Sequence, residues 1–213
     1  KTLMDTAFRQ QTLAQTVALS GTGVHSGKKN NIMVKPAMEN HGIKFRRVDL
    51  PGTQEIPALF KRVVDTSLAT VLGINGAIVS TIEHLMASFA GLGIDNALVE
   101  MDEYEMPIMD GSAKEFTRAF TAAGIVPQRL PRQFIIVKKT IRVQDQDKFV
   151  EVRPAPCLKI TCSINFDQCF IGKQRITFDR TKNNFEKEIS HARTFGFIQD
   201  LELLKKFSLG KGG

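Results

Sequence analysis

Glu83 and His84 are adjacent, and together they carry the strongest local indication of chemistry in the sequence. A carboxylate that can act as a general base, beside an imidazole that can bind a metal, is what metal-assisted hydrolysis requires. A zinc motif of the H-E-x-x-H type would place a second histidine four residues after the first, but position 88 is serine. Further ligands would therefore come from remote sequence. By local rules a packed or solvated His84 is the more common outcome, and Glu83 has a structural alternative as the capping partner of Ser80.

His25 lies in a glycine-rich stretch, residues 21–27, that superficially resembles a phosphate-binding loop. Such a loop needs a helix N-terminus directly after it, whereas a bend rich in lysine and asparagine leads here into another predicted strand. The sequence therefore favours a hairpin turn, and the alternative is a loop that points His25 into a cleft.

Asp110 and the segment around Thr194 are further candidates whose local roles are structural. Asp110 stands where a predicted strand ends and a helix begins, so a turn role is favoured. His191, Arg193 and Thr194 stand at the predicted end of the last helix, where basic residues suit the helix dipole. No one of these residues demands catalysis by itself.

Three helices are predicted to carry or flank these residues. The first runs from Ser80 to about Ala90, with Ser80 and Glu83 as a capping box and Gly91 and Gly93 at its C-terminal end. Ser112 and Glu115 repeat the box before a second helix through Ala122, and Asn184 caps a third helix that ends at Arg193. Apolar alternation predicts strands over 12–19, 31–34, 43–47, 95–101, 133–143, 148–152 and 158–164.

Residues 126–132 are predicted to form a linker, because Pro127 and Pro131 interrupt both periodic patterns. The chain then divides into domains of residues 1–128 and 129–213. A pair of strands ending at residues 35–37 is echoed by strands ending at 153–155, which suggests a duplication. Strands in succession predict an α+β fold of two similar domains of mainly antiparallel sheet plus helices, with the second domain incomplete.

Composition limits the classes of function. The 213 residues carry 29 Lys plus Arg against 22 Asp plus Glu, a net charge of +7, which favours an acidic partner or substrate. The basic pairs are dispersed, and the chain has no Trp and one Tyr for base stacking, so nucleic-acid binding is a weak alternative. No apolar run approaches the roughly 18 residues of a membrane span, and residues 1–9 lack the apolar core of a secretion signal. We expect a cytoplasmic protein without stable membrane insertion.

The three cysteines lie within one short stretch, at positions 157, 162 and 169. An odd count without a C-x-x-C pair argues against a disulfide framework and against a thiolate zinc site. Apolar residues recur at every second position around Cys162, so we expect Cys162 to pack in a core.

Six ordered blocks of sequence together resemble one family. In order and spacing they are similar to the N-terminal two-thirds of UDP-3-O-acyl-N-acetylglucosamine deacetylase, a zinc-dependent hydrolase of lipid A, and hence lipopolysaccharide, biosynthesis. The blocks are Gly23 to Gly27, Phe45 to Asp49, Ser80 to Met86, Gly91 to Ala97, Pro107 to Ser112 and Ala192 to Phe197.

The resemblance implies a fold, a reaction and a set of site residues. It implies two similar α+β domains packed helix layer against helix layer, with the active site between them. The reaction is removal of the N-acetyl group from UDP-3-O-(3-hydroxyacyl)-N-acetylglucosamine, a UDP-linked acylated amino sugar, with Zn²⁺ as cofactor. The matching positions are His84 as first zinc ligand, Glu83 as general base, Thr194 and Phe195 at the scissile carbonyl and substrate, His25 near the metal and Asp110 beside the metal-binding residues.

The chain also departs from the family pattern. The family's other two zinc ligands, in an H-x-x-x-D helix, and a further histidine acid lie downstream of a Gly-Gly like that at 212–213. His41 and His191 match none of them, so one ligand remains where a catalytic zinc site needs about three. The alternatives are a catalytically incomplete fragment, a piece that associates with a separate C-terminal segment, or a basic binding module without chemistry. The amphipathic stretch 197–209 fits an acyl channel or an ordinary core helix.

Overall fold

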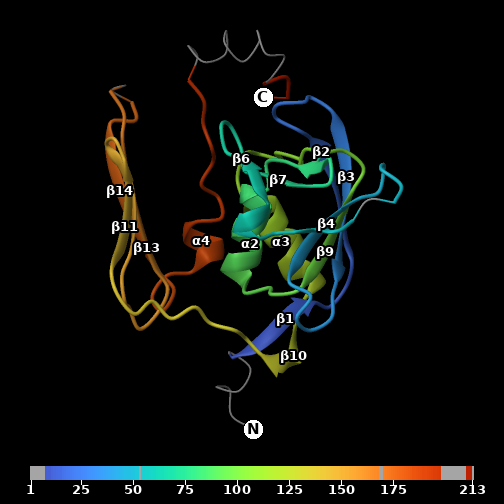
Figure 1. Ribbon diagram of the computed structural model, residues 1–213, viewed down its shortest axis with the longest axis horizontal. Helices are drawn as coiled ribbons and strands as arrows, with labels where there is room; N and C mark the ends of the chain where they lie inside the picture. The colour runs from blue at the N-terminus through green and yellow to red at the C-terminus, as the bar shows by residue number, and fades with distance from the viewer. Residues whose placement is uncertain (1–7, 53, 168–169, 198–209, 213) are drawn as a thin grey trace. The chain divides into compact units, whose positions relative to one another are not determined.

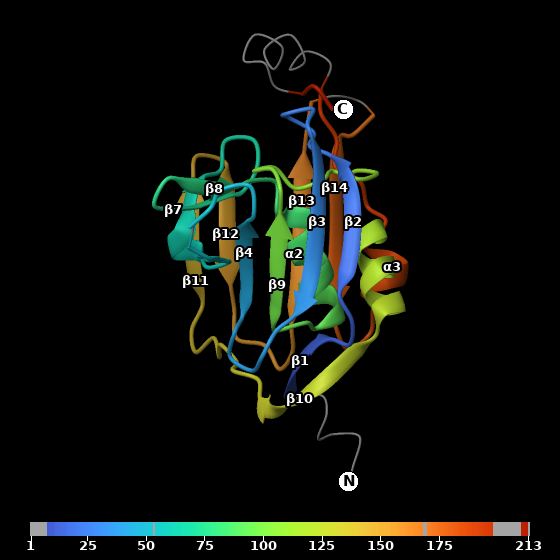
Figure 2. The same cartoon turned by 90° about the vertical axis from the view of Figure 1, so that its right-hand side faces the viewer.

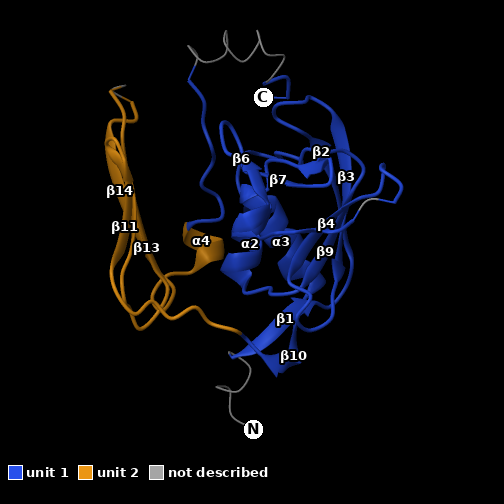
Figure 3. Cartoon of the chain, viewed as in Figure 1, with its two compact units in different colours: residues 1–132, 189–213 blue, residues 133–188 orange. Residues whose placement is uncertain are grey.

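The computed structural model describes residues 8–52, 54–167, 170–197 and 210–212 (Figure 1). The chain forms two compact units, residues 1–132 together with 189–213, and residues 133–188 (Figure 3). The sequence predicts domains of 1–128 and 129–213, and that assignment stays a prediction. The predicted α+β class is confirmed, because short helices accompany several sheets that are mainly antiparallel.

A five-stranded sheet forms the centre of the first unit. Its spatial order is β2 (Val17–Thr22), β3 (Lys29–Pro36), β9 (Ala97–Met101), β4 (Ile43–Arg47) and β5 (Ile56–Pro57) (Figure 2). All neighbours are antiparallel except β9 and β4, which run parallel. Burial alternates along these strands, so one face of the sheet is apolar and must be covered.

Two helices, α2 (Glu83–Leu92) and α3 (Lys114–Ala123), belong to the layer beside the sheet (Figure 1). The rings of Phe89 and Phe120 stack with centroids 5.0 Å apart, and both side chains are fully buried. Ser88, where a zinc motif would have a histidine, instead makes a buried hydrogen bond of 3.1 Å with the hydroxyl of Thr117. The two helices are therefore fixed to each other by packing and by a polar contact.

The remaining strands of the first unit form two smaller sheets. A short 3₁₀ helix, η1 (Phe60–Arg62), precedes a three-stranded sheet of β6 (Val63–Asp65), β7 (Val71–Ile74) and β8 (Ala77–Val79). β1 (Arg9–Leu13) pairs antiparallel with β10 (Ile125–Pro131).

The predicted linker at 126–132 is wrong, because most of it is strand β10. Pro127 and Pro131 are tolerated in β10 because β1 is its only strand partner in this two-stranded sheet, and a proline can occupy such an edge strand without a partner for its missing N–H. Asn96 also stabilises the ribbon: its Nδ2 donates to Oε1 of Gln10 at 2.8 Å and to Oε1 of Gln128 at 2.7 Å. The single strand predicted at 12–19 is wrong, because these residues are divided between β1 and β2.

The capping box predicted at Ser80 is wrong, and the one predicted at Ser112 is only partly realised. Ser80 continues an extended segment, where its N–H donates to Tyr104 O at 2.8 Å, and α2 begins only at Glu83 without a side-chain cap. The Ser112 hydroxyl donates to Asp110, and its Oγ accepts a hydrogen bond from Lys114 N–H at 3.1 Å where α3 begins, but no reciprocal hydrogen bond from Glu115 is found among the described residues. The predicted end of the first helix is confirmed to within a few residues, because Gly93 adopts a left-handed conformation (φ 77°) and its N–H donates to Phe89 O.

The second unit consists of two hairpins and a short helix. β11 (Ile141–Asp145) pairs with β12 (Lys148–Val152), β13 (Lys159–Asn165) pairs with β14 (Lys173–Asp179), and α4 covers Phe185–Glu188. The strand predicted from 133 begins only at 141, and the helix predicted to reach Arg193 ends at 188. The predicted asparagine cap is confirmed, since Lys187 N–H donates to Oδ1 of Asn184 at 3.1 Å.

Cys162 lies on β13 and is exposed, so its predicted core position is wrong. Ile160 on the same strand is exposed as well. Alternating apolar residues mark a face that can be buried, but burial needs a second layer. Within this unit, the described elements provide no such layer for the β13–β14 hairpin.

Candidate active site

Glu83 is the first residue of α2, and its side chain is exposed. One carboxylate oxygen accepts a hydrogen bond from the backbone N–H of Thr70, in the loop before β7. A carboxylate in the first helical turn is stabilised by the positive end of the helix dipole. The side chain is therefore held at the helix start and remains accessible to a proton donor.

His84 follows at the same end of α2 and is half-buried. Burial lowers the pKa of His84 below its usual value, and the carboxylates of Glu83 and Asp110 oppose that shift only in part. The imidazole is thus favoured in its neutral form, which is the form that binds metals. Of the two carboxylates, Glu83 opposes the shift more strongly than Asp110 does.

Asp110 forms the turn that the sequence predicts for it. Its Oδ1 accepts hydrogen bonds from the backbone N–H of Ser112 at 3.0 Å and from the Ser112 hydroxyl at 2.7 Å. The hydroxyl hydrogen bond is the main cause that lowers the pKa of Asp110 below its usual range, and the Arg193 guanidinium acts in the same direction. Asp110 is therefore an ionised and exposed carboxylate, and its charge favours the protonated form of His84.

The segment that carries Thr194 docks onto this turn. Arg193 Nε donates to Asp110 O at 2.6 Å, and Thr194 N–H donates to Gly111 O at 2.7 Å. Gly111 has φ +83°, and a β-carbon placed there would lie 3.7 Å from the methyl group of Thr194. These contacts join residues more than 80 positions apart, so the structure brings Thr194 to the turn formed by Asp110 and Gly111.

Phe195 follows in the same segment, and 53% of its surface is exposed. Its ring meets that of Phe197 edge to face, with centroids 5.6 Å apart. An exposed aromatic face beside Thr194 can pack against an apolar group of a bound molecule. The rest of the predicted amphipathic stretch, residues 198–209, lies outside the described residues.

His25 lies in a tight loop between β2 and β3 and is half-buried. Its Nδ1 is buried and has no hydrogen-bond partner among the residues that the structure describes. Such an atom carries a desolvation cost unless a partner satisfies it. The backbone of this loop also accepts hydrogen bonds from the C-terminal residues, from Lys211 N–H to His25 O at 3.5 Å and from Gly212 N–H to Val24 O at 3.1 Å.

The described residues do not form a complete metal site. Within ranges 8–52, 54–167, 170–197 and 210–212, no group of three or more His, Cys, Asp or Glu side chains is placed to hold a metal ion. A catalytic zinc site needs about three protein ligands. His84 fits the chemistry of one ligand, and the zinc ion itself stays a prediction.

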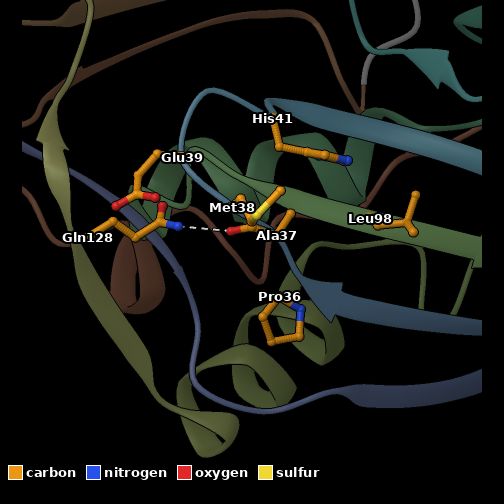
Figure 4. Close-up of a pocket in the computed structure, with 7 residues that line it drawn as sticks. All are labelled: Pro36, Ala37, Met38, Glu39, His41, Leu98 and Gln128. Atoms are coloured by element: carbon orange, nitrogen blue, oxygen red, sulfur yellow. Dashed lines mark hydrogen bonds between the residues drawn. The ribbon is translucent and has the colours of Figure 1, made fainter.

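A pocket of about 510 Å³ lies elsewhere on the first unit (Figure 4). Gln128 Nε2 donates to Ala37 O across it at 2.8 Å. None of the predicted site residues contributes to its wall, so this pocket is separate from the candidate site. Its lining is Pro36, Ala37, Met38, Glu39, His41, Leu98 and Gln128.

No helix in the described part of the chain is long and apolar enough to cross a membrane.

Comparison with known proteins gives one consistent result. The family model for LpxC, UDP-3-O-acyl N-acetylglycosamine deacetylase, matches residues 10–213. A protein of that name from Myxococcus xanthus (strain DK1622) is 45% identical over 207 residues, which is 97% of this chain and 66% of the relative. Relatives from Xanthomonas euvesicatoria and Idiomarina loihiensis are each 44% identical, over 96% and 97% of this chain and 68% of their own lengths. The chain thus spans about two thirds of the length of these relatives.

Proposed function

Because the chain belongs to the UDP-3-O-acyl N-acetylglycosamine deacetylase family, we propose that the complete protein hydrolyses the N-acetyl group of UDP-3-O-(3-hydroxyacyl)-N-acetylglucosamine. The products are acetate and a free amine on the sugar, and the reaction belongs to lipid A biosynthesis. The observation that carries the proposal is the match over residues 10–213, which includes every candidate site residue. A net charge of +7 suits a substrate with a diphosphate, and a cytoplasmic location stays part of the proposal.

Glu83 is proposed as the general base. Its carboxylate is exposed at the start of α2 and has one oxygen free of the contact to Thr70. It would take a proton from the attacking water and pass it to the leaving nitrogen. General base catalysis of this kind contributes typically 100-fold to 10,000-fold in rate.

His84 is proposed as one ligand of a catalytic zinc ion, with the other ligands supplied from outside the described residues. The support is the half-buried imidazole whose pKa is lowered, and which is therefore neutral near pH 7. Zinc bound there would act as a Lewis acid toward the amide carbonyl. Asp110, with its own carboxylate fixed by Ser112, would stabilise the orientation of the imidazole electrostatically.

Thr194 is proposed to stabilise the oxyanion that forms when water adds to the amide. Its backbone is fixed by the hydrogen bond to Gly111, so its hydroxyl is presented from a defined position. A preorganised donor of this kind can contribute about 3 kcal/mol to the transition state. Phe195 would contact the substrate through its exposed ring.

The 213-residue chain is proposed to be catalytically incomplete by itself. It spans about two thirds of its relatives, and the part of it that the structure describes supplies one candidate ligand. The missing ligands would come from a downstream segment of the same protein, whether continuous with this chain or associated with it as a separate segment.

The proposal is tested by Glu83→Gln in the full-length enzyme, with Glu115→Gln as the matched control. Glu115 stands in the first turn of α3, so it has the same helical setting without the proposed role. We expect Glu83→Gln to lower kcat by about 100-fold or more, while zinc content and KM stay close to those of the wild type. The control should retain activity within about twofold, as is usual for a surface substitution. Normal turnover in Glu83→Gln would remove Glu83 as the base, and a wild-type enzyme that releases no acetate would refute the proposed function.

A further inference from the structure

Glu105 carries a buried carboxylate that the proposed mechanism does not use. It follows β9 in the segment that leads to Asp110, and only 1% of its surface is exposed. It forms no ion pair with any residue in the described part of the chain. A buried carboxylate without a cation is costly unless hydrogen bonds satisfy it. Its partners therefore indicate why it is there.

The partners come from the loop that carries His25. One oxygen of Glu105 accepts a hydrogen bond from His25 N–H at 2.9 Å, and the other accepts one from Ser26 N–H at 2.7 Å. Successive backbone N–H groups of a tight loop form an anion-binding concavity. The anion in this concavity is therefore the chain's own carboxylate, and the glycine-rich loop does not need an external phosphate to satisfy these groups.

Gly23 permits this close approach. A β-carbon at position 23 would lie 2.3 Å from Oε2 of Glu105, much closer than any real contact. Any other residue would have to displace either the loop or the carboxylate. The glycine at this position is thus explained by the buried carboxylate packed against it.

The same carboxylate contacts the segment that leads into α2. Oε1 of Glu105 also accepts a hydrogen bond from the hydroxyl of Thr81 at 3.2 Å. Thr81 has φ +60°, a strained conformation for a β-branched residue, and it lies two residues before Glu83. Surrounding contacts must hold such a conformation, and Glu105 supplies one of them.

We infer that Glu105 is a positioning residue, whose carboxylate fixes the His25 loop against the start of α2 and so sets His25 in place relative to Glu83 and His84. Glu105 acts through the backbone of His25 and contacts no reacting atom. The loop that it fixes also accepts the hydrogen bonds from Lys211 and Gly212, so the same contact orders the docking site of these residues. The catalytic part of this inference rests on the proposed deacetylase function.

The test uses the full-length enzyme with Glu105→Gln, and Glu103→Gln as the matched control. Glu103 lies two residues away, and its carboxylate pairs with Lys28 at 2.9 Å without touching the loop backbone at 25 and 26. In Glu105→Gln an amide NH₂ faces one of the two backbone N–H donors, so at least one hydrogen bond is lost. We expect the amides of His25 and Ser26 to exchange with solvent about tenfold faster or more, since a lost hydrogen bond of about 1.4 kcal/mol is a tenfold change. Amides of α3 should be unchanged.

Kinetics separate positioning from a general structural role. We expect Glu105→Gln to lower kcat by about tenfold or more with little change in KM. In a His25→Ala background the same substitution should add almost no further loss, because residues that act through one another are not additive. The inference is overturned if the kcat losses of Glu105→Gln and His25→Ala multiply in the double variant. It is also overturned if the amides of His25 and Ser26 exchange at wild-type rates in Glu105→Gln.

Glu105→Asp provides a second variant if Glu105→Gln does not fold. It keeps a carboxylate but withdraws both oxygens by one methylene. The amide exchange of His25 and Ser26 should therefore be faster than in the wild type, and kcat should be lower. Wild-type values for both quantities would overturn the inference. Because amide exchange is measured without substrate, it reports on the loop even if the wild-type enzyme proves to lack deacetylase activity.

Discussion

The two compact units use similar hairpins and complete them differently. In the first unit, β9 lies between the hairpins β2–β3 and β4–β5 and joins them into one sheet. Its residues Ala97, Val99 and Met101 are fully buried. In the second unit, β11–β12 and β13–β14 remain separate two-stranded sheets, and most of their apolar side chains are exposed. A hairpin therefore forms from local pairing, whereas a buried face also requires a joining strand and a covering layer.

The comparison explains where the candidate site can be assembled. In the first unit, the sheet and its two helices fix Glu83, His84 and Asp110, and the segment at Thr194 docks there through backbone hydrogen bonds. If the second unit is a similar domain, as the resemblance implies, a downstream segment supplies the strand and helix that complete it. The difference in burial between the two units can therefore be tested by comparing this chain with the longer protein.

The largest expected effect concerns metal binding. The 213-residue chain alone should contain almost no zinc, whereas the protein that includes the downstream segment should contain about one zinc per chain. The reason is that a single imidazole does not retain zinc, while about three protein ligands do. Elemental analysis of both purified proteins measures the ratio of zinc to protein chain. Tight stoichiometric zinc in the short chain would mean that His25, His84 and other local residues form a site of their own.

Core substitutions compare the two units directly. Phe89→Ala removes a buried stacked ring from the first unit and should lower the free energy of unfolding by about 3–5 kcal/mol. Phe149→Ala removes a ring of the second unit that is 56% exposed and that has the Arg142 guanidinium 3.9 Å from its centroid. That contact is worth about 1 kcal/mol or less. Denaturant unfolding of both variants measures the difference, and equal losses would show that the second unit has a core of its own.

Thiol reactivity tests whether the exposed face is covered in the longer protein. Cys162 should react readily with a thiol reagent in the 213-residue chain, because its side chain is exposed on β13. With the downstream segment present, the reaction should slow about tenfold or more, since the thiol then reacts only after local opening. Replacing Cys157 and Cys169 by serine isolates the signal. Equal rates in the two proteins would mean that this face stays open.

The smallest expected effect concerns a type of aspartate turn that occurs in each unit, at Asp110 in the first and at Asp179 in the second. Asp179 Oδ1 accepts hydrogen bonds from Thr181 N–H at 3.0 Å and from its hydroxyl at 2.6 Å, as Asp110 does from Ser112. These hydrogen bonds, the hydroxyl first, lower the pKa of Asp179 to about 2. Because the folded-state pKa of Asp179 is depressed, the stabilisation is complete above the usual aspartate pKa of 3.8 and is lost as the pH falls toward 2.

Thr181→Val should therefore raise the pKa of Asp179 toward 3.8, as measured by NMR titration of the carboxyl carbon. Thr177→Val is the control, since its hydroxyl pairs with Thr161 at 3.0 Å on the neighbouring strand and does not touch Asp179. A pKa that stays near 2 in Thr181→Val would contradict the assigned cause.

The sequence by itself determined the features that depend on a few neighbouring residues. Strands 43–47 and 148–152 were predicted with the bounds that the structure shows, because each is a short run rich in β-branched and aromatic residues, which favour strands. Gly93 was predicted near the helix end because glycine tolerates the left-handed conformation found there. Asp110 was predicted as a turn residue, and its side chain does bind the backbone two residues on.

Only the tertiary structure decided which competing local pattern is realised and which faces are buried. Ser80 and Ser112 both have the spacing of capping boxes, but Ser80 lies in an extended segment whose N–H donates to Tyr104, whereas Ser112 accepts from Lys114 N–H at the start of α3. Cys162 has the pattern of a buried strand, but burial depends on a layer that its own segment cannot supply. The docking of Thr194 onto Gly111 and the enclosure of Glu105 by the His25 loop join residues about 80 positions apart. Local hydrogen-bonding and backbone preferences act over a few residues, whereas such contacts exist only after the chain has folded, so no local pattern in the sequence could predict them.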